Sequence, residues 1–172
     1  MPRLEKLVGP LFLCAAILSC RDYPRDPGGT FERVKRDSVV RVGVISEEPW
    51  AKRLPDGSAG GIEGELASGF ARSVGAEPKW HFLSEKKVVE GLENGWLDLA
   101  VGGFTDNSPH KTKLGFTRPY IETPKQKGVG KESHLLAVPR GENRWLTELE
   151  KYLAKHRKQA AAALPQTTPA PQ

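Results

Sequence analysis

The first clear hydrophobic pattern is the run at residues 39–45, Val-Val-Arg-Val-Gly-Val-Ile, which polar residues bound on both sides. Such a run of β-branched residues is typical of a buried strand in a parallel sheet. Aromatic and polar residues alternate at 79–83, and Leu-Asp-Leu-Ala-Val stands at 97–101, which predicts two further strands. A short fourth strand is predicted at 134–138.

Helical periodicity occupies the gaps between these strands. Apolar residues recur every four positions across 62–74, which predicts an amphipathic helix. A second helix is predicted to follow the N-cap Ser84 and to end near 94–95, and a third begins at Asn143. Strands that alternate with single helices favour right-handed βαβ crossovers. The sequence therefore predicts one three-layer α/β lobe with a mainly parallel sheet, placed at residues 38–159.

The segment before this lobe has the pattern of an export signal. Two basic residues precede an apolar run that is too short to span a bilayer, as in a signal peptide. The run ends in Ile-Leu-Ser-Cys at 17–20, which resembles the bacterial lipobox, so residues 1–20 are predicted to be a lipoprotein signal and Cys20 to be the lipidation site. An uncleaved anchor, or a cysteine that follows a secretory signal by chance, stays open, and either would still export the chain.

Two further segments are predicted to lie outside the folded part. Residues 21–37 are polar and rich in Pro and Gly, which is typical of a flexible tether. Residues 160–172 combine an alanine run with a Pro, Thr and Gln-rich end, which predicts a disordered tail.

Composition and charge narrow the possible functions. A chain of 172 residues has room for one domain with a real core, and its net charge of +5 comes from interspersed charges without basic blocks, so we expect no nucleic-acid partner. Both cysteines fall in the predicted signal, which leaves the mature chain without a free thiol. The four histidines have no metal-ligand spacing and no nucleotide motif is present, so we expect neither a metal nor a cofactor.

The position of a binding site follows from the predicted topology. Ligands of open α/β sheets bind beyond the carboxyl ends of the strands. Those ends are the loop at 46–50 and the Gly-Gly-Phe-Thr turn at 102–105, which makes them the first candidates.

Several motifs in the order of the predicted elements resemble those of the family 3 extracellular solute-binding proteins, the receptors of amino-acid ABC importers. The matching segments are Val-Gly-Val at 42–44 with Pro49-Trp50, Gly-Ile-Glu-Gly-Glu-Leu at 61–66, Leu-Glu-Asn-Gly-Trp-Leu-Asp at 92–98, Gly-Gly-Phe-Thr at 102–105 and Gly-Phe-Thr-Arg-Pro-Tyr at 115–120. The segment at 135–143 resembles the family's return segment. Only a short connection separates it from Tyr120, where a complete receptor has its second lobe. The resemblance therefore implies a periplasmic binding protein-like fold reduced to one lobe.

The resemblance also implies a set of ligand-binding residues. Trp50 matches the aromatic that packs on the ligand, and Lys111, after Ser108-Pro109 at a predicted helix start, falls near the arginine that holds the ligand's α-carboxylate. The turn residues that would approach the ligand are Gly103, Phe104 and Thr105. Lysine is a poorer match, because it offers a point charge in place of a two-pronged donor. A tight strand exit and a solvated lysine are the alternative interpretation.

The leading functional hypothesis is non-catalytic. It describes a membrane-anchored lipoprotein of the periplasm or cell envelope that binds or senses a small carboxylate-bearing solute, an amino acid or an organic acid. Its partners would be a membrane transporter or another periplasmic protein. One alternative is a protein-interaction module with an exposed apolar patch where the second lobe would pack. Another is a dehydratase-type enzyme like some relatives in the family, but that chemistry needs a buried acid and an enclosed cleft, which one lobe does not readily provide.

Overall fold

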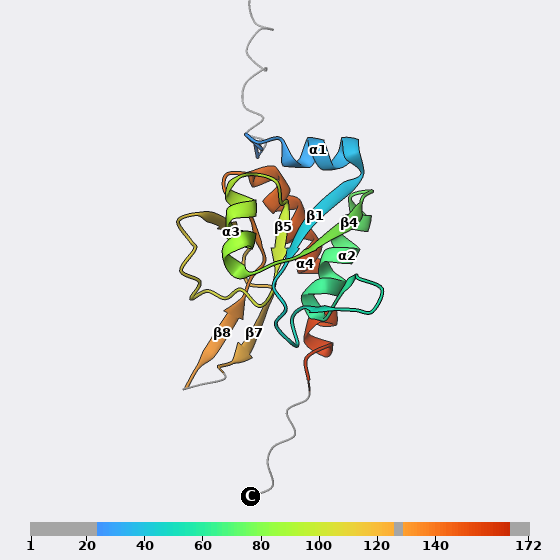
Figure 1. Cartoon of the computed structure of the whole chain (residues 1–172). Helices are drawn as coiled ribbons and strands as arrows, with labels where there is room; N and C mark the ends of the chain where they lie inside the picture. The colour runs from blue at the N-terminus through green and yellow to red at the C-terminus, as the bar shows by residue number, and fades with distance from the viewer. Residues whose placement is uncertain (1–23, 126–128, 166–172) are drawn as a thin grey trace, which may run out of the picture.

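The central sheet has five strands, in the order β4-β1-β5-β9-β6 (Figure 1). The computed structural model describes residues 24–125 and 129–165. The strands are β1 (Val39–Val44), β4 (Glu77–Phe82), β5 (Leu99–Val101), β6 (Leu114–Phe116) and β9 (Ala137–Pro139). β1 pairs in parallel with β4 and β5, and Val42 lies opposite Trp80 and Leu99. β9 is antiparallel to both β5 and β6, so four of the five strands share one direction.

Helices cover both faces of this sheet, which confirms the predicted three-layer α/β lobe. α2 (Ile62–Ser73) and α4 (Asn143–Ala162) pack on one face, and α3 (Glu85–Glu93) packs on the other (Figure 1). Successive residues of β1 face opposite sides of the sheet. The valines at 40, 42 and 44 join the larger core, while Gly43 faces α3. A Cβ at Gly43 would lie 2.7 Å from Leu97, so this glycine allows the close approach of the smaller core.

A first helix lies where a flexible tether was expected. α1 (Thr30–Asp37) buries Val34 completely and packs against β1 and α4. The prediction of a tether over 21–37 is therefore wrong for this helix. The segment has few apolar residues and a Pro-Gly-rich approach, so its local sequence is that of a linker.

Two carboxylates, one distant in sequence and one close to the helix, accept hydrogen bonds at the start of α1. Glu142 accepts hydrogen bonds from the backbone N–H of Gly28, at 2.6 Å, and of Thr30, at 2.8 Å. Asp26 accepts from the N–H of Phe31 at 3.1 Å and, at the start of α4, from that of Trp145 at 3.0 Å. These bonds satisfy N–H groups that a helix start leaves without partners. The N-terminus of α1 is thereby joined to the start of α4.

The last helix also extends past its predicted end. α4 continues to Ala162, and Ala160 is 3% exposed against the larger core, so the expected disorder from 160 onward is wrong for these residues. The predicted signal at 1–20, with Cys20, and the tail from 166 onward lie outside the described residues.

The predicted strand at 134–138 is in fact two strands. β8 (Lys131–His134) pairs with β7 (Ile121–Pro124) in an antiparallel hairpin, and the chain then turns into β9. This hairpin projects from one end of the lobe (Figure 1) and corresponds to the short connection where the second lobe was expected to be absent. A small ribbon of β2 (Lys52–Arg53) and β3 (Ala59–Gly60) completes the fold.

A buried carboxylate joins three parts of the lobe. The side chain of Asp98 is 1% exposed and forms ion pairs with Arg33 of α1 and Arg41 of β1. It also accepts from the backbone N–H of Arg41 at 2.8 Å, and its own carbonyl accepts from the indole N–H of Trp145 at 2.7 Å.

Within the described residues, no helix is long and apolar enough to cross a membrane.

Candidate ligand-binding site

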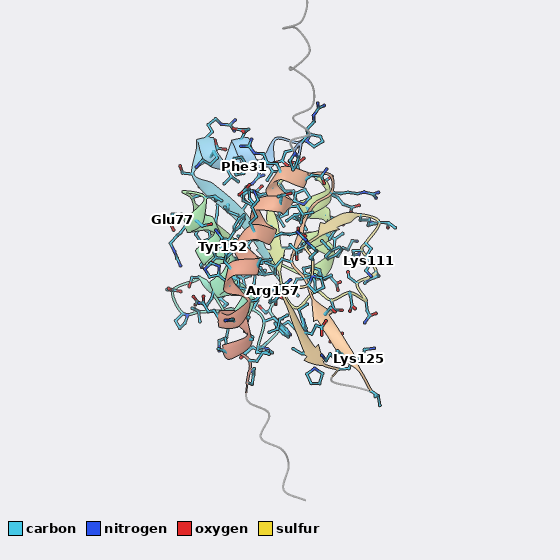
Figure 2. All side chains as sticks on the ribbon, turned by 180° about the vertical axis from the view of Figure 1, so that it is seen from behind. Phe31, Glu77, Lys111, Lys125, Tyr152 and Arg157 are labelled. Atoms are coloured by element: carbon cyan, nitrogen blue, oxygen red, sulfur yellow. The ribbon has the colours of Figure 1, made fainter. Side chains whose placement is uncertain are left out.

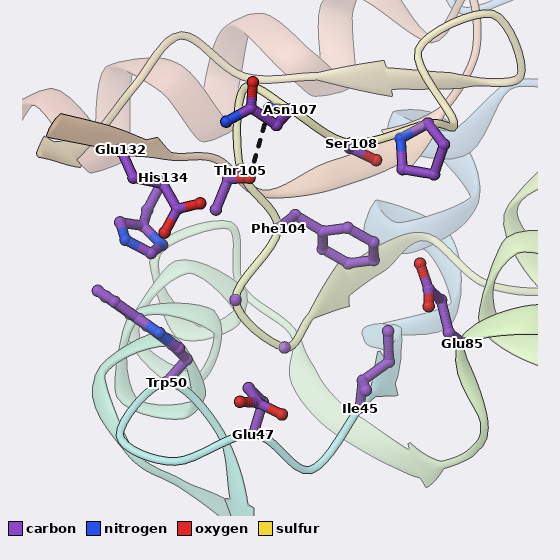
Figure 3. Close-up of a pocket in the computed structure, with 13 residues that line it drawn as sticks. Ile45, Glu47, Trp50, Glu85, Phe104, Thr105, Asn107, Ser108, Glu132 and His134 are labelled. Carbon is purple, nitrogen blue, oxygen red and sulfur yellow. Dashed lines mark hydrogen bonds between the residues drawn. The ribbon is translucent and has the colours of Figure 1, made fainter. Parts of the chain in front are cut away.

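A pocket of about 390 Å³ lies at the carboxyl ends of β1 and β5, where the topology places ligand sites (Figure 3). Its wall comes from the loop after β1, the turn after β5, the start of α3 and the strand β8. The lining residues are Ile45, Glu47, Trp50, Glu85, Gly102, Gly103, Phe104, Thr105, Asn107, Ser108, Pro109, Glu132 and His134. Four of the predicted ligand-binding residues, Trp50, Gly103, Phe104 and Thr105, are among them.

The turn at Gly102-Gly103 forms the floor and has room for no side chain. Gly102 has φ 141°, and a Cβ there would lie 2.5 Å from the Cβ of Ile45. Gly103 has φ 73°, and a Cβ there would lie 2.8 Å from Trp50. Two glycines are needed because positive φ and a close approach coincide at both positions.

A buried carboxylate of α2 fixes this turn from below. Glu63 Oε2 accepts from the N–H of Gly102 at 2.6 Å and from that of Gly103 at 3.0 Å. Tyr120 donates its hydroxyl to Glu63 Oε1 at 2.8 Å. The N–H groups of Gly102 and Gly103 are therefore engaged within the protein.

Complete burial makes Glu63 an unusually weak acid. Glu63 is 0% exposed, and this burial raises its pKa from 4.5 to about 7, although the hydrogen bonds from Gly102, Gly103 and Tyr120 oppose the rise. Burial, followed by the neighbouring Glu63 carboxylate, also raises the pKa of Tyr120. Near neutral pH, the group that holds the pocket floor is thus close to its titration midpoint.

Trp50 lies in the pocket wall, but its ring is already covered. The imidazole of His134 stacks on it with ring centroids 3.7 Å apart and an interplanar angle of 28°, and Trp50 is 7% exposed (Figure 3). The family resemblance implied that this ring packs on a ligand, and the structure places the His134 side chain of the same lobe on one of its faces.

His134 is a pocket residue that the sequence analysis did not select. It is 2% exposed, and its Nε2 lies 2.9 Å from Thr123 Oγ1 across the hairpin. Burial lowers its pKa despite the nearby Glu132 and Asp106, which favours the neutral ring. Its Nδ1 is buried and has no hydrogen-bond partner among the described residues. A lone histidine has no sequence pattern, so only its position at the end of β8 could have indicated it.

Lys111 does not belong to this pocket. It is exposed, lies at the edge of the molecule in Figure 2, and is not among the lining residues. The helix that was predicted to begin at Ser108-Pro109 is absent, and residues 106–113 form successive turns before β6. Apart from Pro109, this segment has no apolar residue, so a helix there would have no apolar face to bury.

The charge of the pocket is negative. Its ionisable lining residues are Glu47, Glu85, Glu132 and His134, with no lysine or arginine among the lining residues. Glu85 pairs with His110, whose Nε2 lies 2.9 Å from its carboxylate. The expected basic residue for a carboxylate is thus absent from the wall. Among the described residues, no group of three or more potential ligands is arranged to hold a metal ion.

Comparison with known proteins agrees with this architecture. The family model of the bacterial extracellular solute-binding proteins, family 3, matches residues 40–164. The chain belongs to this family. The match begins at the second residue of β1, includes the other strands of the sheet and continues to the end of α4. No curated protein matches the chain.

Solved structures with the same fold include single lobes. The arginine-bound form of domain 1 from TmArgBP is 22% identical, with a TM-score of 0.62 over 72% of this chain and 97% of that one. An ancestral cationic amino acid solute-binding protein, AncCDT-1, is 13% identical with a TM-score of 0.66, over 77% of this chain and 95% of that one. EhuB in complex with hydroxyectoine is 11% identical with a TM-score of 0.68, over 81% and 91%. The shared feature is the fold of an amino-acid-binding lobe.

Proposed function

We propose that this member of the family binds a small amino-acid-like solute in the pocket at the end of β1 and β5, without catalysing a reaction. The observation that carries the proposal is the Gly102-Gly103 turn, which Glu63 fixes in a conformation that keeps the floor free of side chains. A preorganised wall with polar side chains around it is what a solute site requires. Arginine, cationic amino acids and hydroxyectoine, named for the structural neighbours, indicate the size of ligand to test.

The pocket consists of one wall. Two-lobed receptors enclose their ligand between two walls, which excludes water from the contacts and multiplies them. We therefore expect weak binding by the isolated lobe, because an open site desolvates less of its ligand. A membrane transporter or a periplasmic protein would supply the missing wall, and the lipobox at Cys20 supports attachment of the lobe to the membrane near such a partner.

Binding without catalysis fits the position of Glu63, the carboxylic acid among the described residues whose pKa burial raises to about 7. An ancestral cyclohexadienyl dehydratase is also among the similar folds, at 13% identity. Here the buried acid, Glu63, accepts hydrogen bonds from two backbone N–H groups and the Tyr120 hydroxyl, and it is not among the residues that line the pocket. An acid engaged in this way has no free oxygen for a substrate.

The interaction-module alternative predicted an exposed apolar patch. In the described part of the chain, the large hydrophobic side chains that are exposed are Trp96, beyond α3, and Val129, in the hairpin turn. They lie on different elements and form no continuous surface, so no observation favours this alternative over solute binding.

A thermal-shift screen tests the proposal. Purified chain is titrated with amino acids, organic acids and amines, and a ligand at about one hundred times its Kd should add about 2.7 kcal/mol, or several degrees. The pocket variant Asn107→Trp adds bulk at a lining residue, and Lys111→Trp adds the same bulk at an exposed residue outside the pocket. Loss of the shift in the first variant alone supports the site. Equal loss in both, or no shift with any solute, contradicts it.

A further inference from the structure

The polar groups around the pocket are mainly acceptors, and this determines the class of ligand that the proposed solute site would take. The inference below deepens the proposed function and rests on it. Three kinds of group contribute: side-chain carboxylates, backbone carbonyls of the floor, and one ring nitrogen.

The carboxylates come from opposite sides of the pocket. Glu47 follows β1 and lies beside the floor, since its Cγ would be 3.5 Å from a Cβ at Gly103. Glu132 lies on β8 across the pocket (Figure 3). No described residue makes a hydrogen bond or ion pair with either side chain, unlike the third carboxylate, Glu85, which His110 occupies. Two carboxylates without protein partners that face one cavity favour a positively charged guest.

The floor adds acceptors but no free N–H. Because the N–H groups of Gly102 and Gly103 donate to Glu63, the turn has only its carbonyl oxygens for a ligand. Neither carbonyl accepts a hydrogen bond from a residue in the described ranges 24–125 and 129–165. An anion next to Gly102 and Gly103 would meet no free N–H group of these two residues, which weakens the usual way in which glycine turns hold anions.

His134 gives an independent indication that a partner is missing. Its side chain lines the pocket and is almost fully buried, and its Nδ1 has no protein partner among the described residues. A buried polar atom without a partner costs about 1–3 kcal/mol. When the Nε2 proton is donated to Thr123 Oγ1, Nδ1 keeps a lone pair and can accept a hydrogen bond. An N–H donor would satisfy this lone pair.

The pocket wall has few groups that could bind an anionic ligand. No lysine or arginine lines the pocket, and Lys111 lies outside it. The remaining side-chain donors are the neutral hydroxyl and amide groups of Thr105, Ser108 and Asn107. A carboxylate would be placed among unpaired carboxylates without a compensating cation, which is unfavourable.

We infer that this pocket recognises small organic cations through their guanidinium or ammonium group, with Glu47, Glu132 and the Nδ1 of His134 as acceptors, and that it does not require a carboxylate on the ligand. This differs from the carboxylate-bearing solute that the family resemblance implied at Lys111. The binding pocket is the same, but the recognised group is the cationic end of the solute.

A matched set of ligands tests the inference. Arginine and agmatine share a guanidinium group, but agmatine lacks the carboxylate, and glutarate has carboxylates without a cation. In isothermal titration of the purified chain, agmatine is expected to bind within about threefold of arginine or more tightly, a difference of at most about 0.65 kcal/mol. Glutarate is expected not to bind. Binding should weaken as salt is added.

Charge-removing variants identify the acceptors. Glu132→Gln and Glu47→Gln keep shape and are each expected to weaken agmatine binding about three- to tenfold, as expected for the loss of one partly exposed charge pair. Glu122→Gln is the matched control, because Glu122 lies on the same hairpin, is exposed, pairs with Lys131 and does not line the pocket. That control should bind agmatine as the unchanged chain does.

Nitrogen-15 NMR of labelled histidine tests the role of His134 without a substitution that could disturb folding. The expected free chain has its proton on Nε2, and the Nδ1 resonance moves when agmatine is added. A protonated Nδ1, or a resonance that agmatine leaves unchanged, would overturn the assignment of Nδ1 as an acceptor.

The possible failures are distinct. If glutarate binds and Asn107→Trp abolishes that binding, the solute site stands and the cation inference is wrong. If arginine binds but agmatine does not, the site requires a carboxylate and the inference is equally wrong. If none of the three binds and the wider thermal-shift screen finds no solute, the proposed function itself fails.

Discussion

Replacement of Glu63 by glutamine should change how the stability of the lobe depends on pH. Glu63 has an ordinary pKa of 4.5 and a folded pKa of about 7, so the folded chain binds a proton more strongly than the unfolded chain. Its contribution to stability is fully present below pH 4.5 and is lost as the pH rises through about 7. At about 1.36 kcal/mol per pH unit, the loss between about pH 5 and pH 8 amounts to roughly 2–3 kcal/mol.

Glutamine keeps most of the contacts but cannot titrate. Its amide oxygen can accept from Gly102 and Gly103, and its amide NH₂ can donate to the Tyr120 oxygen, which now donates to Glu63. We expect Glu63→Gln to resemble the unchanged chain near pH 5 and to exceed its stability near pH 8, by about 2 kcal/mol or more. The measurement is urea unfolding followed by tryptophan fluorescence over this pH range.

Comparing the pH profiles of stability of the variant and the unchanged chain cancels the contributions of the other titrating groups. Burial lowers the pKa of His81 and of His134, which makes stability rise with pH, but both residues are present in both proteins. Glu65→Gln is the control, since Glu65 lies in the same turn of α2 but is exposed. It should reproduce the pH profile of the unchanged chain. Parallel profiles for Glu63→Gln and the unchanged chain would refute the reasoning, because Glu63 would then not titrate in this range.

Other parts of the lobe give simpler tests. Asp98→Asn leaves two arginines without their buried counter-charge and should cost about 3 kcal/mol in urea unfolding; a cost under about 1 kcal/mol would contradict its role as a joint between α1 and β1. Glu142→Ala removes the acceptor at the start of α1 and should cost about 1–2 kcal/mol, with faster hydrogen exchange confined to α1. Gly102→Ala places a Cβ 2.5 Å from Ile45 at φ 141° and should lower the melting temperature and abolish solute binding; unchanged binding would show that the floor can move freely.

The strands β1, β4 and β5 and the helices α2, α3 and α4 could be predicted because their signals are local, whereas β6 was not predicted. β1 lies in the core and α2 buries one of its faces, and burial selects apolar residues at fixed spacing. This explains the β-branched run at β1 and the four-residue repeat in α2. The turn at Gly102-Gly103 was also predictable, since a glycine pair after a buried strand indicates positive φ or close approach. The family resemblance then placed the absent second lobe between Tyr120 and Leu135, where the structure has the β7–β8 hairpin.

The errors have non-local causes. α1 depends on Glu142, more than a hundred residues away in sequence, so its eight residues alone give the pattern of a linker. Lys111 was selected by its distance from the turn, but a helix start was needed to bring it to the pocket, and the segment lacks an apolar face. His134 enters the site because the hairpin returns to the turn after β5, where His134 pairs with Thr105, and no spacing in the sequence records this.

The stack of His134 on Trp50 explains how a single wall can stay ordered without a second lobe. An aromatic ring in the wall of an open pocket would be exposed to water, at a cost proportional to its apolar area. Here His134 covers that ring, and Thr123 holds the imidazole in place from the neighbouring strand. The hairpin β7–β8 therefore does more than join two parts of the chain. It supplies the side chain that keeps Trp50 buried and places Glu132 opposite Glu47, so that the shape and the charge of the pocket both depend on the hairpin.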